Sequence, residues 1–475
     1  YSGFSIQGYE EPDGSHQQFM VAQAPQVHPI PEETTIEEAG SYVLALGTVY
    51  RALFTTLDVE SGGTMFVEGG ATGTGWETLR AGLRNGLDVT GLCSSEERAA
   101  RIEEAGGGAI DRTADEHADI WGPIPADPDA WDEWKAAGEP LLAQFRDQHG
   151  RLADYAASHA GAQSFPRTFQ LLDEGGQLTF WGASTGYRMT FLGKPGRSTP
   201  EAMFDRVDLR AGEGLLVYYG TDTGPDGVLD ETGLRAIEAG RDADARVVVV
   251  AYTDEQAEFV ESLGYGDAVA GVRSIEALER REAEFEWPDT LPDFPHPQAD
   301  PEAFKRAVRA YTDSAFKPLG MAVGEHLRTS ENPRGNPDVV FERAGHDALG
   351  VSTMLVRPHT GRVVYSEDMT DRRYSFYAPQ VWMRQRDIHM PTADVLGTHL
   401  SNSYEVQQLN AEIDAGALDV TTPRVVDWTD LPEAHQAMWD NEHEAEAYVV
   451  DHALPAEGLR NREELYKGWG RRDRD

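Results

Sequence analysis

Residues 64–75 read TMFVEGGATGTG, a short apolar run followed by a glycine-rich turn. A helix-like stretch continues from Trp76 to Leu83, and a second apolar run, LDVTGLC, occupies residues 87–93. Ser94-Ser95-Glu96-Glu97 comes next and is typical of a helix start, because hydroxyl side chains cap the first turn and acidic residues favour it. Strands that alternate with helices at this spacing predict an α/β fold with a doubly wound, Rossmann-like parallel sheet.

The same pattern returns further along the chain. Residues 215–227 read LLVYYGTDTGPDG, residues 246–252 form the next apolar run, and Thr253-Asp254 opens the following helix. Further matches keep their order, and we pair these positions: Gly69 with Gly220, Gly73 with Gly224, Asp154 with Asp338, Ala160-Gly161 with Ala344-Gly345, and Phe191 with Phe376. An ordered series of this kind indicates an internal repeat. We therefore expect tandem Rossmann-like units at residues 45–195 and 196–415.

The composition excludes several classes of protein. Lys and Arg total 41, Asp and Glu total 82, and the formal net charge is −41. Such a chain would repel phosphate backbones, so we expect no nucleic-acid partner and interpret the charge as a solvated surface. A single cysteine, Cys93, excludes a disulfide framework and a multi-cysteine zinc site, and the histidines lack paired metal-ligand spacing. No apolar run approaches the ~20 residues of a membrane span, so we expect a cytoplasmic protein without a membrane partner.

Several segments outside the glycine turns carry a family resemblance. They are Gly8-Tyr9-Glu10, Glu37–Tyr42, Gly47–Arg51, Val381–Arg386 and Gly397–His399. These segments resemble crotonyl-CoA carboxylase/reductases, which are zinc-free enoyl-CoA reductases of the medium-chain dehydrogenase/reductase superfamily. The resemblance implies NADPH-dependent reduction of a short-chain enoyl-CoA, with hydride transfer to the β-carbon and protonation of the α-carbon.

The chain departs from this family in two ways. The resemblance assigns residues 1–44 to the last segment of a GroES-like catalytic domain, whose earlier part would precede Tyr1, and residues 416–475 to its closing segment. The family has one nucleotide-binding unit, whereas this chain has two. The chain also resembles the acrylyl-CoA reductase part of a propionyl-CoA synthase. The expected partners are an enoyl-CoA substrate, the upstream catalytic sequence or sister domains of a multienzyme, and further copies of the chain in a homo-oligomer.

The first glycine turn has the residues that a dinucleotide needs. Gly70, Gly73 and Gly75 would let the backbone approach a pyrophosphate at the start of a helix, where N–H groups and the helix dipole favour anions. Trp76 stands where the family often has a third glycine. The second repeat has a more regular set, which leaves open which repeat is occupied: Gly220, Gly224 and Gly227.

The end of the second strand normally separates NAD from NADP, because an acidic residue there would repel a 2′-phosphate. The first repeat has Ser94, Ser95 and Arg98 at this point, and hydroxyls with a guanidinium suit a phosphate. The second repeat has Thr253 and Asp254. We therefore predict that the first repeat binds NADPH and that the second is empty or degenerate.

The remaining site residues are assigned by the resemblance alone. It implies a catalytic group that holds a water near the substrate α-carbon: Tyr9, Glu10 and His399. It implies contacts to the nicotinamide part of the cofactor from Thr48, Gly182 and Ala183. It implies an acyl pocket lined by Trp382 and Met383, and contacts to CoA phosphates from Arg384 and Arg386.

Other functions remain open at this stage. The enolate formed by hydride transfer could attack CO2 instead of taking a proton, which would give reductive carboxylation. The duplicated unit could also be a non-catalytic scaffold for assembly of a multienzyme. A quinone or alkenal reductase of the same superfamily is disfavoured by the CoA-type segments within residues 381–399.

Overall fold

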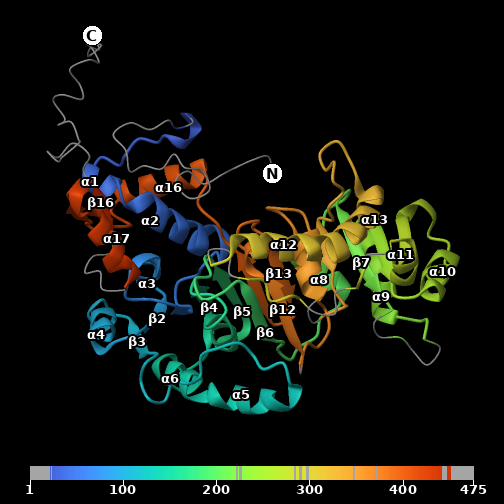
Figure 1. Ribbon diagram of the computed structural model, residues 1–475, viewed down its shortest axis with the longest axis horizontal. Helices are drawn as coiled ribbons and strands as arrows, with labels where there is room; N and C mark the ends of the chain where they lie inside the picture. The colour runs from blue at the N-terminus through green and yellow to red at the C-terminus, as the bar shows by residue number, and fades with distance from the viewer. Residues whose placement is uncertain are drawn as a thin grey trace, which may run out of the picture.

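The computed structural model describes residues 22, 24–220, 223, 227–282, 285–287, 291–295, 299–345, 348–370, 372–440 and 447–450. Within these residues the repeats lie side by side, the first on the left of Figure 1 and the second on the right. No helix in this part of the chain is long and apolar enough to cross a bilayer.

The first repeat forms a parallel sheet in the order β3-β2-β1-β4-β5. Its strands are β1 (Thr64–Val67), β2 (Asp88–Cys93), β3 (Gly108–Asp111), β4 (Ala153–Ser158) and β5 (Leu172–Phe180). Its main helices are α3 (Gly73–Arg84), α4 (Glu96–Glu104), α5 (Trp131–Ala137), α6 (Glu139–His149) and α7 (Phe165–Gln170). The expected strand–glycine turn–helix unit is β1 followed by α3, and all four residues of β1 are buried.

The second repeat forms the matching order β9-β8-β7-β10-β11, again with parallel strands. Its strands are β7 (Gly214–Tyr219), β8 (Arg246–Ala251), β9 (Val269–Ser274), β10 (Val339–Phe341) and β11 (Arg362–Val364). Its helices include α8 (Pro200–Arg206), α9 (Glu231–Asp242), α10 (Asp254–Ser262), α11 (Ile275–Arg281) and α14 (Leu349–Leu355). The α/β repeat expected from the sequence is therefore present.

The repeats share one continuous sheet, which the sequence did not indicate. A hairpin of β13 (Asp387–Met390) and β14 (Ala393–Gly397) joins them into a 12-stranded sheet. β13 pairs parallel with β11 of the second repeat, β14 pairs parallel with β5 of the first, and β13 and β14 are antiparallel. The antiparallel pair reverses strand direction, so the carboxyl edge of the first repeat lies on the same side as the amino edge of the second.

A second antiparallel pair crosses between the repeats. It consists of β6 (Arg188–Leu192) and β12 (Arg373–Tyr377). Phe376 on β12 packs edge-on against Phe165 of the first repeat at 5.7 Å between ring centroids, and Tyr374 stacks on Phe191 at 5.3 Å. Large buried aromatic rings from both repeats therefore form one core.

The structure corrects the pairing of the glycines. Asp154 Oδ2 accepts a hydrogen bond from Thr64 N at 2.7 Å, and Asp338 Oδ2 accepts one from Gly214 N at 2.8 Å. This confirms the pairing of Asp154 with Asp338. It also makes Thr64 the equivalent of Gly214, so that Gly70, and not Gly69, corresponds to Gly220.

Residues 393–414 lie in the range assigned to the second repeat but contact the first. β14 pairs with β5, and α16 (Ser403–Asp414) packs on α2 (Tyr42–Tyr50). Arg51 forms an ion pair with Glu405 of α16 at 2.7 Å. We propose that these residues belong to the first repeat, which is interrupted by the second.

Candidate functional site

The glycines of the β1–α3 turn have distinct structural roles. A Cβ on Gly70 would lie 2.6 Å from the Cα of Gly91 in the neighbouring strand, so the turn needs glycine there. A Cβ on Gly75 would clash with the carbonyl oxygen of Gly69. Glycine at this position therefore permits close packing of the helix on the strand. Gly73 has a φ of +55° and open space beyond its Cα, which leaves room for a ligand. This division of roles matches that of a dinucleotide-binding turn.

The start of α3 lies beside a cavity and lacks a cap from the side chain of its N-cap residue. The side chain of Thr72, the N-cap residue, makes no capping hydrogen bond. The N-terminal N–H groups of a helix and its dipole favour an anion. A cavity of about 380 Å³ opens at this point.

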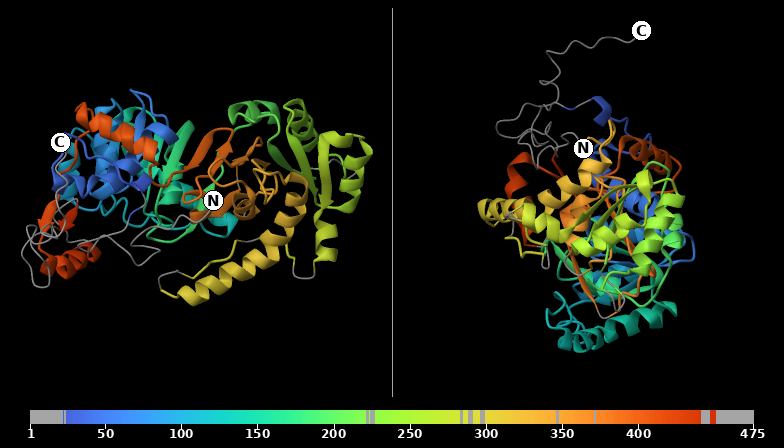
Figure 2. Two further views of the ribbon diagram at one scale, coloured as in Figure 1. Left: turned by 90° about the horizontal axis from the view of Figure 1, so that it is seen from above. Right: turned by 90° about the vertical axis from the view of Figure 1, so that its right-hand side faces the viewer.

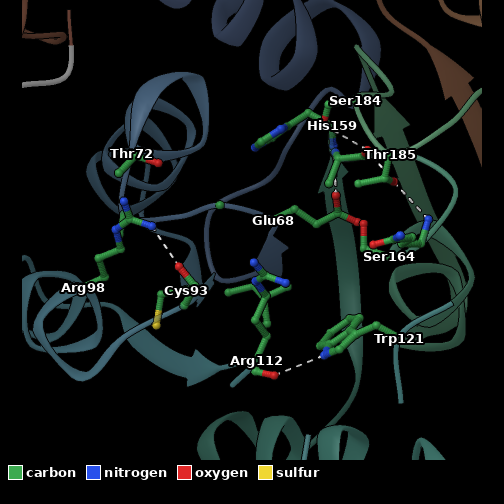
Figure 3. A pocket seen from close by; sticks show the side chains of 16 residues that line it. Glu68, Thr72, Cys93, Arg98, Arg112, Trp121, His159, Ser164, Ser184 and Thr185 are labelled. Atoms are coloured by element: carbon green, nitrogen blue, oxygen red, sulfur yellow. Dashed lines mark hydrogen bonds between the residues drawn. The ribbon is translucent and has the colours of Figure 1, made fainter. Parts of the chain in front are cut away.

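This cavity, which we call the nucleotide cavity after the ligand proposed for it below, lies at the carboxyl ends of β1, β2 and β4 (Figure 3). Its labelled lining residues are Glu68, Thr72, Cys93, Arg98, Arg112, Trp121, His159, Ser164, Ser184 and Thr185. The carboxylate of Glu68 is turned to the backbone, since its Oε2 accepts from His159 N at 3.1 Å and from Ala160 N at 3.0 Å. The cavity also contains the ends of two arginine side chains.

Arg98 lies where the sequence places a phosphate-binding residue. Its Nη1 donates to Ser94 Oγ at 2.8 Å, and both residues line the cavity. Ser95 instead caps α4, because its Oγ accepts from the backbone N–H of Arg98 at 3.3 Å. The geometry therefore brings together Ser94 and Arg98 and leaves Ser95 with a local structural bond.

Arg112 is a cavity residue that sequence reasoning missed. It follows β3 directly, and Figure 3 shows its guanidinium directed into the cavity. Its carbonyl oxygen accepts from Trp121 Nε1 at 3.3 Å, which fixes the backbone at this point. Its position in the sequence could have indicated this role, since Arg112 is the first residue after β3, just as Ser94 is the first residue after β2. Two guanidinium groups around one cavity suit a phosphate group.

Two buried polar atoms lining the cavity lack a partner. His159 Nε2 and Ser164 Oγ have no hydrogen-bond partner among the described residues. A buried polar atom without a partner costs free energy, so native structures usually satisfy it with protein, water or ligand. The uncapped helix, the cations and these two atoms together fit a phosphorylated, polar ligand.

The turn after β5 contributes Ser184 and Thr185 to the lining of the nucleotide cavity. Gly182 has a φ of +70°, and a Cβ there would lie 3.2 Å from His159 O and 3.6 Å from Cζ3 of Trp382. Ala183 is buried, and Thr185 Oγ1 donates to Ala160 O at 2.8 Å. The turn thus lies between the end of β4 and Trp382.

Trp382 lies between the turn after β5 and the residues that line a second cavity. Its Nε1 is buried and has no hydrogen-bond partner within the described part of the chain. The residue that follows it, Met383, lines the second cavity together with Arg384, Arg386 and His399. The structure therefore brings most of the expected substrate residues and His399 to one place.

Arg386 is held mainly by the protein itself. It is 4% exposed, and its Nη groups donate to the carbonyl oxygens of Gln380 at 3.1 Å and Met354 at 3.2 Å. Burial lowers the pKa of its guanidinium to about 9. These contacts favour a structural role, so Arg384 is the better candidate for a phosphate contact.

Thr48 lines neither cavity, and two further expected site residues fall outside the part of the chain that the structure describes. Thr48 is buried in α2, where its Oγ1 donates to Leu44 O at 2.7 Å. Tyr9 and Glu10 lie outside the described residues. Their assigned roles stay predictions.

The matching site in the second repeat is filled by its own side chains. Asp230 caps α9, accepting from Gly233 N at 2.9 Å and from Gly220 N at 2.8 Å. It is also ion-paired with Arg343, and both side chains are 1% exposed. A carboxylate thus caps the helix in the second repeat, whereas the Thr72 side chain makes no capping hydrogen bond in the first.

Gln256 closes the other side of the second glycine turn. It matches Arg98, since Thr253 caps α10 as Ser95 caps α4. Its Oε1 accepts from Thr253 N at 3.1 Å, its Nε2 donates to Gly227 O at 3.0 Å, and it would clash with a Cβ on Gly220. The position of a phosphate-binding cation is therefore taken by an amide that fills the turn.

Comparison with known proteins identifies relatives for part of the chain. The chain is 30% identical over 192 residues to a crotonyl-CoA carboxylase/reductase of Cereibacter sphaeroides, covering 39% of this chain and 44% of that protein. It is 26% identical over 185 residues to a crotonyl-CoA reductase of Streptomyces avermitilis, covering 38% and 40%. The chain thus matches less than half the length of these relatives. They confirm the resemblance to crotonyl-CoA carboxylase/reductases, and no protein-family model matches the chain.

Solved structures give weaker matches. A crotonyl-CoA carboxylase/reductase, AntE, in complex with NADP is 17% identical, with a TM-score of 0.47 over 94% of this chain and 64% of that one. A 2-octenoyl-CoA carboxylase reductase, CinF, in complex with NADP and 2-octenoyl-CoA is 21% identical, with a TM-score of 0.34 over 45% and 51%. Scores this low carry no weight in the functional argument below.

Proposed function

We propose that the chain is part of an NADPH-dependent enoyl-CoA reductase and that its first repeat binds the cofactor. The contrast between the repeats carries this proposal. The first has an uncapped helix, Arg98 and Arg112 around a cavity, whereas the second has Asp230 and Gln256 in the corresponding places. The partial relationship to crotonyl-CoA reductases supports the choice of reaction.

The residues of the first repeat would hold each part of NADPH. The start of α3 would bind the pyrophosphate, while Ser94, Arg98 and Arg112 would bind the 2′-phosphate. Ser94, the residue that directly follows β2, is not acidic and would not repel the 2′-phosphate. When bound, NADPH would supply a hydride to the β-carbon of the enoyl thioester.

After hydride transfer, the protein must stabilise the negative charge on the thioester oxygen and supply a proton to the α-carbon. The Gly182 turn would position the nicotinamide ring against Trp382, whose neighbour Met383 lines the second cavity. The buried Nε1–H of Trp382 has no partner in the described structure and is a candidate donor to the thioester oxygen, where charge develops. His399 lies at that cavity and, with Glu10 and Tyr9, would hold the water that protonates the α-carbon.

Two refinements remain within this proposal. Reductive carboxylation stays an alternative outcome, because the relative in Cereibacter sphaeroides is a carboxylase/reductase and that in Streptomyces avermitilis is a reductase. The narrower assignment to acrylyl-CoA and a propionyl-CoA synthase rests on the sequence resemblance. The filled turn of the second repeat favours a structural role for that repeat, as in the scaffold hypothesis.

The proposed activity has a direct assay. NADPH oxidation is followed at 340 nm after addition of crotonyl-CoA or acrylyl-CoA, using this chain and, in parallel, a longer chain with any preceding natural sequence. We expect butyryl-CoA or propionyl-CoA as the main product. A carboxylated product that dominates in bicarbonate would favour the alternative, and no turnover by either chain would contradict the proposed function.

A further inference from the structure

Strained backbone positions gather around His399. In the described part of the chain, six residues other than glycine have a positive φ, and three of these are aspartates, which tolerate this conformation: Asp58, Asp208 and Asp244. The other three are His359 (φ 73°), Gln385 (φ 49°) and Leu400 (φ 43°). Leu400 directly follows His399 in the chain. Residues with long side chains adopt this region only where the surrounding structure holds them, and such positions cluster at functional sites.

The side chain of Gln385 bridges two histidines. Its Nε2 donates to His399 O at 2.8 Å, and its Oε1 is 2.9 Å from His359 Nδ1. A carbonyl oxygen can only accept a hydrogen bond, so it fixes which end of the amide faces His399. The amide oxygen then faces His359, whose Nδ1 must carry the hydrogen. The hydrogen bonds therefore run in one direction, from His359 through Gln385 to the backbone of His399.

The backbone of Gln385 is tied to Trp382. Gln385 N donates to Trp382 O at 3.1 Å and closes the turn that begins at Trp382. This turn lies directly against the end of β14, since a Cβ on Gly397 would lie 2.4 Å from Val381 O. One glutamine thus contacts both Trp382 and His399, the two groups placed beside the reacting thioester above.

The bridge lies where the repeats meet. Gln385 precedes β13 and His399 follows β14, the antiparallel strands that join the repeats. Figure 2 shows this part of the chain, in orange, between the blue-green first repeat and the yellow-green second. His359 precedes β11 of the second repeat. The contact therefore ties a turn of the second repeat to the end of the strand that pairs with the first.

We propose that Gln385 is a positioning residue that sets the location of the His399 imidazole. The inference rests on the proposed function, in which His399 holds the water that protonates the α-carbon, and it adds a residue to that site. The bond to His399 O would fix the backbone from which the imidazole extends, and the bond to Trp382 O would hold the candidate oxyanion donor beside it. His359 would orient the amide from the second repeat.

Removal of the amide tests this role. Gln385→Met keeps the length of the side chain but loses both hydrogen bonds. In the natural protein, it should lower the kcat for crotonyl-CoA by about 10- to 100-fold, because a small misplacement of a catalytic group costs up to about 10²-fold in rate. The Kd for NADPH should stay the same, because Gln385 does not line the nucleotide cavity.

Isotope effects distinguish slower protonation from a general loss of structure. If the water is misplaced, the solvent isotope effect on kcat in D2O should rise in Gln385→Met, and the isotope effect with 4-deuterated NADPH should fall toward unity. Damage to the fold would reduce the number of active molecules and leave both isotope effects unchanged. A lower kcat with unchanged isotope effects would therefore overturn the proposal.

Two further variants serve as controls. Gln407 is exposed on α16 and lines neither cavity, so Gln407→Met should leave kcat and both isotope effects unchanged. His359→Gly permits the positive φ and removes only the outer contact of the amide. It should lower kcat by less than Gln385→Met does, and a larger loss would contradict the direct role of Gln385.

A crystal structure of Gln385→Met separates this inference from the proposed function. Residues 398–400 should shift relative to the wild-type protein, while the nucleotide cavity keeps its geometry. Such a shift without enoyl-CoA turnover by the wild-type protein would retain the positioning role and refute the reductase. Turnover by the wild-type protein with an unchanged kcat in Gln385→Met would retain the reductase and refute the positioning role.

Discussion

Charge reversal at Arg98 is expected to raise the KM for NADPH by about 100-fold or more. The side chain lines the nucleotide cavity with Ser94 and contacts its hydroxyl at 2.8 Å. Arg98→Glu removes a guanidinium from a phosphate and places a carboxylate there. A charge-assisted hydrogen bond contributes about 1.5–3 kcal/mol, and repulsion adds to the loss. The KM for NADH, which lacks the 2′-phosphate, should change far less.

The control for this substitution is a charge reversal outside the cavity. Arg146 is exposed on α6 and pairs with Glu139 at 3.5 Å. Arg146→Glu should leave the NADPH and NADH values unchanged. The Kd for NADPH, read from its fluorescence, gives the same comparison without turnover. An unchanged NADPH affinity in Arg98→Glu would contradict the placement of the 2′-phosphate.

The second large effect is expected on stability, at the filled site of the second repeat. Asp230 and Arg343 are an almost fully buried ion pair. Arg343→Met would leave Asp230 buried without its cation, and loss of one partner of a buried pair typically costs about 3–5 kcal/mol. We expect the Tm to fall by several degrees while the Kd for NADPH stays the same.

A double variant distinguishes the lost ion pair from lost packing. Asp230→Asn/Arg343→Met removes the buried charge of Asp230 together with that of Arg343 and leaves only the partly exposed Glu367 without its cation, so it should be less destabilised than Arg343→Met alone. A weaker Kd for NADPH in either variant would show that the second repeat takes part in cofactor binding. An unchanged Tm in Arg343→Met would contradict the role of Asp230 as an internal substitute for a bound anion.

The repeated unit was predictable because its signals are local. A glycine turn after an apolar run predicts β1 and α3, and a hydroxyl at a helix start predicts the cap that Ser95 forms. Arg98 beside the nucleotide cavity follows from its position one turn into α4. These features depend on neighbouring residues, so one sequence is enough to find them.

The joining of the repeats was not predictable in this way. β13 and β14 are separated by Pro391 and Thr392, which indicate a turn but do not show which strands pair with the hairpin. The two partner strands, β5 and β11, belong to different repeats, and β5 lies far from β14 in the sequence. Only tertiary pairing shows that the hairpin belongs half to each repeat.

The sequence pattern also did not show which side chains fill the glycine turn of the second repeat or are held by the backbone. Gln256 looks like an ordinary first-turn residue of α10, but it turns back and fills the glycine turn. From the sequence, Arg386 and Arg384 are equal candidates for a phosphate contact, but the guanidinium of Arg386 donates to backbone carbonyl oxygens. The number and spacing of glycines alone therefore favoured the second repeat as the cofactor site, whereas the side chains around the glycines favour the first.

The number of NADPH molecules bound per chain tests the central claim most directly. Calorimetric titration of the natural protein with NADPH should give one site per chain, and Arg98→Glu should weaken that site. Two sites per chain, or one site that persists unchanged in Arg98→Glu, would contradict the assignment of the cofactor to the first repeat alone.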